Sequence, residues 1–220
     1  MDADCEDGLF CTGVETCSAG LCQNSGDPCG DALTCNETTD SCDALPVALV
    51  GPDDFETGFG SWSNVGGDNI DWTRDSGGTP SSGTGPTVDH TTGTASGFYL
   101  YTESSTNGTG YPNMTALLES PCIDLSGFTS TTWTFWYHMV GTAMGTLFAE
   151  VAPGCGTTWN TEFTLAGSQQ SSQSDPYLPA NIDLSGYAGT SIQLRFRGVT
   201  ATSWSGDMTI DDVLVEATPE

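Results

Sequence analysis

The chain has 220 residues, enough for one β-sandwich and a small additional unit, and no stretch shows the 3.6-residue apolar period of an amphipathic helix. It carries 29 acidic residues against three basic ones, for a formal charge of −26. Phosphate backbones and anionic membranes repel such a chain, which argues against nucleic-acid and lipid-surface binding. No apolar run reaches the roughly 18 residues that a membrane helix needs, so we expect no membrane insertion.

The first 42 residues contain seven of the nine cysteines: Cys5, Cys11, Cys17, Cys22, Cys29, Cys35 and Cys42. So many cysteines in so short a segment predict a fold held by covalent links in place of a core. Their spacings are all longer than CxxC and no histidine is near, which favours disulfides over zinc. The odd count leaves one thiol outside the pairs.

The run DCEDGLFCTGVETC, followed by AGLCQNSGDPC, resembles the DGxFCxGxExC repeat of exported proteins from environmental bacteria. In that repeat a further cysteine usually lies just before the position of Cys5, which would explain the odd count. The acids around it predict either a calcium site or a solvated terminus, and the second interpretation is the simpler: Asp2, Asp4, Glu6 and Asp7. The chain start lacks the features of a signal peptide although its cysteines indicate export, so we expect a mature or excised part of a longer protein.

The cysteines stop after Cys42, and an apolar segment, Leu45–Val50, follows. We place the domain boundary there, with a disulfide-rich domain over residues 1–45 and a second domain over residues 46–220. Val47–Val50 is either a packed linker or the first edge strand of the second domain.

Segments typical of β-strands recur through the second domain, separated by Gly, Pro, Ser and Thr clusters. They are Gly97–Thr102, Thr131–Val140, Thr146–Val151, Ser191–Arg197 and Met208–Glu216. This pattern predicts an all-β fold, an antiparallel jelly-roll β-sandwich.

The two central strands, Thr131–Val140 and Thr146–Val151, are separated by Gly141–Gly145, which we interpret as a turn that returns the chain antiparallel. Alternation in the first of them assigns one set of side chains to the core: Trp133, Phe135, Tyr137 and Met139. Trp136 and His138 fall on the other face, which we expect to be partly exposed.

From residue 53 the chain resembles the MAM domain, an extracellular module of meprins, neuropilins and receptor protein tyrosine phosphatase mu. The resemblance rests on DDFETGFGSW (53–62), LESPCIDLSG (118–127), TFWYHMVGTAMGTLFAEV (134–151) and IQLRFRGVTATSWSGDMTIDDVLV (192–215), and on residues 70–105. It is closest in character to bacterial members. Animal members usually carry four cysteines, whereas only Cys122 and Cys155 remain here. These two flank the central strand pair, and we predict a disulfide between them.

Catalytic patterns are weak in this sequence. There is no HExxH motif, His90 and His138 are far apart in the chain, and no GxSxG elbow is present. A carboxylate pair that cleaves glycosides is not excluded by sequence alone. We therefore expect a domain that is not an enzyme.

A calcium site is the better-supported prediction. In DFE, strand alternation would bury Phe55 and place Asp54 and Glu56 together on the opposite side. IDDV places Asp211 inside an apolar strand, where its charge requires a partner. Jelly rolls bring their first and last strands together, and such carboxylates are ligands that calcium prefers. The MAM resemblance implies the same role for Glu56 and Asp211 and makes Asp89 plausible, while hydrogen bonding without metal is the alternative.

The second prediction is a recognition face. If Phe135 and Phe196 both point to the core, then Trp136, His138, Arg195 and Arg197 point outward together with Glu150. The ring would stack on a sugar, and the guanidinium groups would bind hydroxyls, sulfate or a carboxylate. The alternative is structural: cross-strand ion pairs of the arginines with Glu150 and stacking on Trp136. Trp204 is a further candidate ligand-binding residue, in the adjacent SWSGD loop.

The sequence thus predicts a non-catalytic recognition or adhesion module, stabilised by calcium and disulfides, of a secreted or cell-surface protein. Its partner would be an extracellular glycan or protein, and self-association is left open. Two alternatives remain: an assembly module of a surface filament or appendage, and a substrate-targeting accessory domain of a secreted hydrolase.

Overall fold

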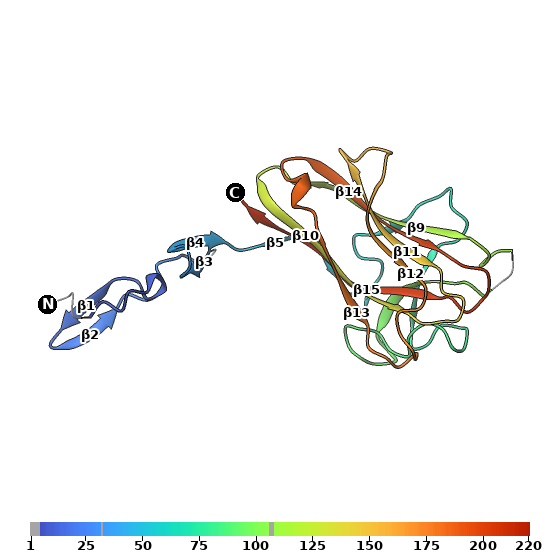
Figure 1. Cartoon of the computed structure of the whole chain (residues 1–220), viewed down its shortest axis with the longest axis horizontal. Coiled ribbons are helices and arrows are strands. Elements are labelled where there is room, and N and C mark those ends of the chain that lie inside the picture. The colour runs from blue at the N-terminus through green and yellow to red at the C-terminus, as the bar shows by residue number, and fades with distance from the viewer. Residues whose placement is uncertain (1–4, 32, 106–107) are drawn as a thin grey trace. The chain divides into compact units, whose positions relative to one another are not determined.

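The structure, a computed structural model, describes residues 5–31, 33–105 and 108–220. Within those ranges its regular secondary structure consists of β-strands and two short 3-10 turns, η2 (Phe10–Thr12) and η3 (Ser185–Tyr187). No helix in the described part of the chain is long and apolar enough to cross a membrane. The chain divides into two compact units, one formed by residues up to Val47 together with Thr218–Glu220, the other by Ala48–Ala217 (Figure 1).

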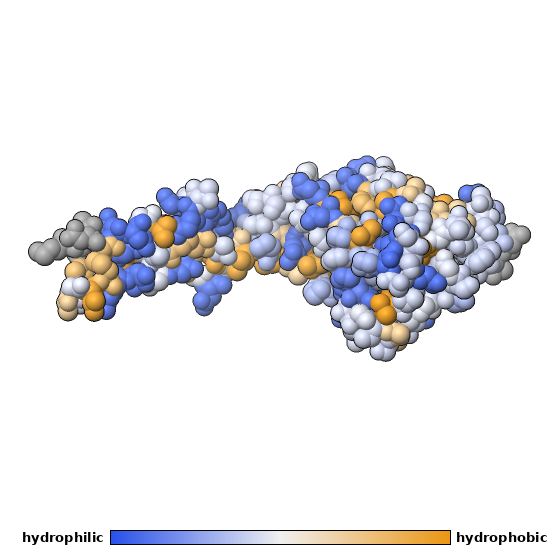
Figure 2. Space-filling view, turned by 60° about the horizontal axis from the view of Figure 1, so that its bottom comes forward, coloured by the Kyte–Doolittle hydropathy of each residue, from blue (hydrophilic) through white to orange (hydrophobic). Residues whose placement is uncertain are grey.

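The first unit consists of two small hairpins: β1 (Glu15–Ser18) with β2 (Leu21–Asn24), and β3 (Leu33–Asn36) with β4 (Ser41–Ala44). Three disulfides hold it, which confirms the predicted covalent staples: Cys5–Cys22, Cys11–Cys35 and Cys29–Cys42. Cys17 lies outside these pairs. No large apolar side chain is buried among the described residues up to Val47, and orange atoms are interspersed with blue over this unit's surface (Figure 2).

Side-chain carboxylates of this unit accept hydrogen bonds from its backbone N–H groups and so help to hold a segment whose described residues form no apolar core. Glu37 accepts hydrogen bonds from the backbone N–H groups of Phe10 and Cys11 at 2.9 and 2.7 Å. Asp7 caps the adjacent turn by accepting from the Leu9 N–H at 2.9 Å, whereas Asp2 and Asp4 lie outside the described residues.

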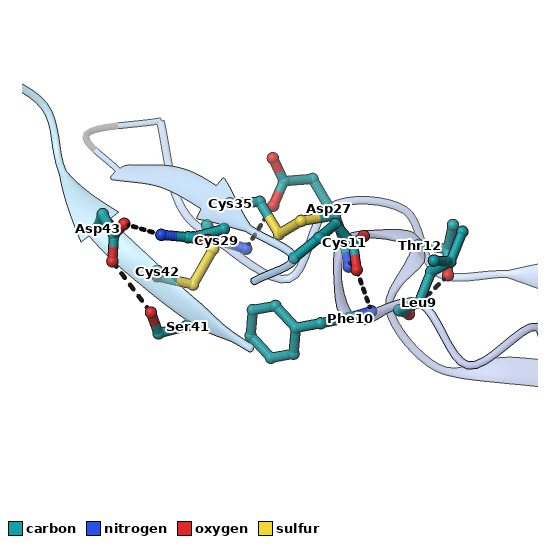
Figure 3. Close-up of a disulfide and its surroundings, with 12 residues drawn as sticks. Leu9, Phe10, Cys11, Thr12, Asp27, Cys29, Cys35, Ser41, Cys42 and Asp43 are labelled. Atoms are coloured by element: carbon teal, nitrogen blue, oxygen red, sulfur yellow. Dashed lines mark hydrogen bonds between the residues drawn. A yellow bond between two sulfur atoms is a disulfide. The ribbon is translucent and has the colours of Figure 1, made fainter. Parts of the chain in front are cut away.

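One group in this unit has the spacing of a metal site. Asp27, Cys29 and Cys35 bring three potential ligand atoms within 4.8 Å of one another (Figure 3). Both sulfurs are bonded in disulfides, and Asp27 Oδ1 accepts the Cys29 N–H at 2.8 Å. The cluster is therefore explained by the disulfide framework, because cysteine binds metal as a thiolate and both of these sulfurs are in disulfides.

The second unit is a sandwich of two sheets. The six-stranded sheet has the order β13-β10-β15-β8-β7, with β5 paired to β15: β5 (Val47–Asp53), β7 (Trp72–Ser76), β8 (Phe98–Thr102), β10 (Phe128–Met139), β13 (Leu178–Asp183) and β15 (Met208–Pro219). The five-stranded sheet has the order β12-β11-β14-β9-β6: β6 (Ser63–Asn64), β9 (Thr115–Asp124), β11 (Thr146–Pro153), β12 (Asn160–Ala166) and β14 (Ser191–Val199).

Aromatic side chains from both sheets form the centre of the core. Phe196 of β14 lies with its ring centroid 4.8 Å from those of both Trp133 and Phe135 of β10, and 5.0 Å from that of Trp62. The four residues predicted to face the core from β10 are buried. The disulfide Cys122–Cys155 is also confirmed, and it links the end of β9 to the segment after β11.

The predicted jelly-roll-type sandwich and its five strands are confirmed as β8, β10, β11, β14 and β15. The hairpin prediction for Gly141–Gly145 is wrong, because β10 belongs to the six-stranded sheet and β11 to the five-stranded one. The segment passes between the layers: the Ala143 N–H donates to Ser205 O at 2.9 Å, and a Cβ added at Gly145 would lie 1.9 Å from Val199 O. The interpretation failed because a crossover and a hairpin turn use the same glycine-rich sequence.

Candidate functional site

The DFE segment forms a turn, so the prediction of strand alternation there is wrong. Phe55 is buried as expected, but its φ of +56° is left-handed. Asp54 Oδ1 accepts the Glu56 N–H at 3.0 Å and shapes this turn. Glu56 is thereby directed to the start of β8, where its Oε1 accepts the Phe98 N–H at 2.7 Å.

The IDDV segment meets the loop that contains Asp89. Asp211 is fully buried in β15, and its Oδ2 accepts the His90 N–H at 2.8 Å. Asp212, at φ +45°, hydrogen-bonds through Oδ2 to His90 Nδ1 and through Oδ1 to Thr91 Oγ1 (2.7 Å). The predicted meeting of the first and last strands is confirmed, since β5 pairs with β15.

Asp89 is buried one residue before His90 and organises its own loop. It accepts hydrogen bonds from Thr92 N–H, Thr92 Oγ1 and Thr94 N–H at 2.6–2.9 Å. Burial opposes its ionisation, but these hydrogen bonds prevail and lower its pKa. Its carboxylate lies against Gly97, where an added Cβ would come within 2.2 Å of Asp89 Cγ. Asp89 and Glu56 therefore contact consecutive residues at the start of β8.

Asp211 fits the chemistry of a structural cation site. Burial raises the pKa of its carboxyl to about 8, with the neighbouring Asp212 and Asp89 charges acting in the same direction. Within the described chain, no arginine forms an ion pair with it. A hard cation would compensate this charge, with Glu56 and Asp89 as the carboxylates that approach the same region. The three do not form a group of ligand atoms within 4.8 Å in the described residues, so backbone carbonyls would have to complete such a site.

Next to these acids, a hollow of about 200 Å³ opens between residues 86–93 and 173–177. We call it the Tyr177 hollow. His90 forms one wall, and its ring stacks on Trp136 of β10 with centroids 3.9 Å apart and an angle of 18°. Tyr177, which is buried, forms another wall, 5.8 Å from the His90 ring. One face of Trp136 is thus covered by His90, and only the remainder of that ring is available to a ligand.

His138 is fully buried, so the prediction that it contacts a ligand is wrong. The segment 167–177 covers it: Gln170 Oε1 accepts the Met139 N–H at 2.8 Å, and Gln170 Nε2 donates to Tyr137 O and Pro176 O. Neither ring nitrogen of His138 has a hydrogen-bond partner among the described residues. Burial lowers the pKa of His138 to about 4, so the ring is neutral at physiological pH.

Arg195 and Arg197 lie on the outer face of the five-stranded sheet and share Glu150, which is buried. Glu150 Oε2 accepts from Arg195 Nε at 2.8 Å, and Oε1 accepts from Arg197 Nε at 3.0 Å. Burial alone would raise the pKa of Glu150, but the two guanidinium groups lower it. Arg195 stacks on Trp159, the residue before β12, at 4.0 Å, and Arg197 stacks on Phe148 of β11 at 3.7 Å.

The predicted single recognition face does not exist. Trp136 points out of the six-stranded sheet, whereas Arg195 and Arg197 point out of the five-stranded sheet. Strand alternation correctly predicted that these three side chains point away from the core. The tryptophan and the two arginines nevertheless lie on opposite outer faces of the sandwich. The alternative prediction, that the arginines form cross-strand ion pairs with Glu150, is confirmed. Their predicted stacking on Trp136 is wrong, because they stack on Trp159 and Phe148. Trp204 lies elsewhere, in the loop before β15, and is 44% exposed.

Sequence reasoning missed the residues that complete the Tyr177 hollow. Tyr177 and Asp175 lie in an irregular segment without periodicity, and nothing in the local sequence marks them. His90 had one signal, its position directly after Asp89. Both histidines approach Tyr177, since the His138 ring lies 5.4 Å from it.

Comparison with known proteins identifies relatives of the second unit. The chain matches the MAM domain, meprin/A5/mu, over residues 54–219. It is 34% identical over 148 residues to human MAM domain-containing protein 2, a match that covers 67% of this chain and 20% of that protein. It is 26% identical to Xenopus laevis Neuropilin-1, over 87% of this chain and 22% of that protein. The chain therefore spans about a fifth of the length of these relatives.

Among solved structures, the K1 cleaved adhesin domain of Lys-gingipain from Porphyromonas gingivalis W83 aligns at a TM-score of 0.51 with 19% identity, covering 80% of this chain and 98% of that one. The Stig cyclase Fisc from Fischerella sp. TAU aligns at 0.51 with 13% identity, covering 80% and 99%. An adhesin and a cyclase share this architecture, so the fold alone does not decide between binding and catalysis. Membership rests on the sequence match, which covers most of the chain: it belongs to the MAM domain family.

Proposed function

We propose that this chain is a non-catalytic recognition module of a secreted or cell-surface protein, which binds an extracellular glycan or protein. Membership of the MAM family and the four disulfides support this assignment. The observation that carries it is the Tyr177 hollow, whose His90 wall is held by Trp136, Asp211 and Asp212. Such a preformed concave surface is typical of binding sites.

Calcium is the second part of the proposal. Asp211, Glu56 and Asp89 would hold the ion, with Asp54 shaping the turn that directs Glu56. Because Asp211 also accepts the His90 N–H, the ion would stabilise the loop that forms one side of the hollow. We further propose that residues 5–42 are a DGxFCxGxExC repeat and that the parent is a bacterial exported protein.

A screen of the full chain on glycan and protein arrays, with and without calcium, tests the function. We expect saturable binding to a restricted set of ligands and none of the hydrolase activities of a parallel substrate panel. Hydrolysis that persists in the purified chain would contradict a non-catalytic role. Lateral self-assembly without affinity for any ligand would favour the filament alternative.

A further inference from the structure

The Tyr177 hollow has the dimensions and walls of a site for one long side chain. Its volume of about 200 Å³ lies below the roughly 300–1,000 Å³ of sites for drug-sized ligands. Pro86, Val88 and Pro176 supply apolar contacts, and the His90 and Tyr177 rings lie 5.8 Å apart at an angle of 59°. The two rings are in contact with each other, and the wall that they form with these residues suits an aliphatic stem packed against it.

Asp175 also lines the hollow, and backbone N–H groups orient its carboxylate. Asp175 Oδ2 accepts the backbone N–H groups of Ser171 and Ser172 at 2.8 and 2.9 Å. Asp175 Oδ1 receives no hydrogen bond from the residues that the structure describes. The carboxylate is therefore held in place and keeps one oxygen as an acceptor for a ligand.

Gln173 joins the two walls of the hollow. Its Oε1 accepts the Gly83 N–H at 2.8 Å, and its Nε2 donates to Thr84 O at 2.7 Å. The segment that carries Asp175 and Tyr177 is thereby tied to the chain leading into Pro86 and Val88. A site fixed in this way is organised before its ligand arrives, which reduces the entropic cost of binding.

The net charge of the chain favours a cationic ligand for the hollow over an anionic one. The chain carries −26, and its three arginines are used elsewhere. Arg74 donates to the carbonyls of Phe55 and Glu56, and the other two pair with Glu150 on the opposite sheet. The long-range field attracts cations and repels anions, and an ammonium against an aromatic ring gains cation–π stabilisation.

We propose that the Tyr177 hollow binds the ammonium or guanidinium group of a lysine or arginine side chain from a basic segment of a partner protein. Asp175 Oδ1 accepts its hydrogen bond, and Tyr177, Val88 and Pro86 contact its stem. This inference rests on the proposed recognition function and specifies its partner as a basic protein. A flat sugar ring fits less well, because His90 covers one face of Trp136.

An NMR titration of the ¹⁵N-labelled full chain tests this proposal. The probe is N-acetyl-lysine N-methylamide, and the matched probe is N-acetyl-norleucine N-methylamide, which has the stem without the charge. We expect saturable shifts over residues 86–93 and 173–177 with the lysine probe and about tenfold weaker binding of norleucine, the loss of one charged hydrogen bond. Asp175→Asn should weaken the lysine probe by a similar factor, whereas Asp71→Asn, an exposed acid with the same charge change, should leave it unchanged.

Equal binding of the two probes, absence of saturable shifts in these segments, or equal effects of the two aspartate variants would overturn the proposal. If Asp175→Asn does not fold, Val88→Trp fills the hollow without changing the charge and should abolish the shifts. An array partner that binds Val88→Trp as tightly as the parent would refute this site while leaving the recognition function intact.

Discussion

Acidification should destabilise the sandwich through His138. The ring is fully buried, and its pKa falls from about 6.5 in an unfolded chain to about 4 in the fold because burial disfavours the charged form. Between these values the unfolded chain binds a proton that the folded chain does not. The free energy of unfolding therefore decreases as the pH falls from about 6.5 to about 4, and the stabilisation is complete above that window.

The magnitude follows from the pKa difference of about 2.5, which corresponds to about 3 kcal/mol at about 1.36 kcal/mol per pKa unit. For a chain of this size, that is roughly a 10 °C change in Tm. Asp175 is the acid facing His138, and its charge opposes the lowering without reversing it. The carboxylates of Asp89 and Glu150, whose pKa values are lowered, also lose stabilisation in acid, and they do so in parent and variant alike.

The assay is therefore a comparison of two pH profiles. Urea unfolding followed by tryptophan fluorescence reports the sandwich alone, because all six tryptophans lie between residues 62 and 204. His138→Gln should flatten the profile between pH 6.5 and 4 by about 3 kcal/mol relative to the parent. His90→Gln removes an imidazole that is 28% exposed, and this control separates the effect of burying a histidine from the loss of a histidine side chain. Parallel profiles for parent and His138→Gln would refute the reasoning.

Three further predictions concern stability. Glu150→Gln should lower the free energy of unfolding in urea by about 3–5 kcal/mol, because two guanidinium groups lose a buried partner. The control is Glu119→Gln, whose carboxylate lies 3.8 Å from Arg195 and whose loss should cost less than about 1 kcal/mol. Chelation should lower the calorimetric Tm, since calcium at 100 times its Kd adds about 2.7 kcal/mol to the free energy of unfolding. Glu56→Gln should abolish the difference between calcium and chelator, and an unchanged Tm of the parent would contradict the calcium proposal. Replacing Cys122 and Cys155 together by serine should cost about 3–4 kcal/mol for a sequence separation of 33, and an unchanged urea midpoint would contradict this.

Strand alternation predicted more of the fold than of the site. The two-residue period of a strand correctly predicted that Trp133 and Phe135 are buried. It also correctly predicted that Trp136 and Arg195 point away from the core. It could not state to which sheet a strand belongs, because that depends on long-range pairing. The recognition face joined residues of two sheets for this reason.

The sequence also did not predict which outward-facing side chains are buried by irregular segments. His138 lies on the outer face of β10, as predicted, yet is fully buried because residues 167–177 cross over it. The hydrogen bonds that hold this cover come from Gln170, which has no periodicity to identify it. By contrast, Asp211 was predictable, because a carboxylate inside an apolar strand must find partners and the first and last strands of a jelly roll meet.

The contacts of the three arginines explain why buried Asp211 has no arginine partner among the described residues. Arg74 satisfies the carbonyls of the DFE turn, and Arg195 and Arg197 compensate Glu150, so the described chain has no arginine left for Asp211, one of four buried aspartates. Its two oxygens accept the backbone N–H groups of His90 and Asp212, each at 2.8 Å, and its charge can be compensated in two further ways. A proton can neutralise Asp211, as the raised pKa of about 8 indicates, or an external cation can do so. Calcium competes with that proton, since it binds the ionised carboxylate. We therefore expect the stabilisation by calcium to increase as the pH rises from 6 to 9, and calorimetry in calcium and in chelator at both ends of that range measures it; a pH-independent difference would mean that Asp211 is not a ligand.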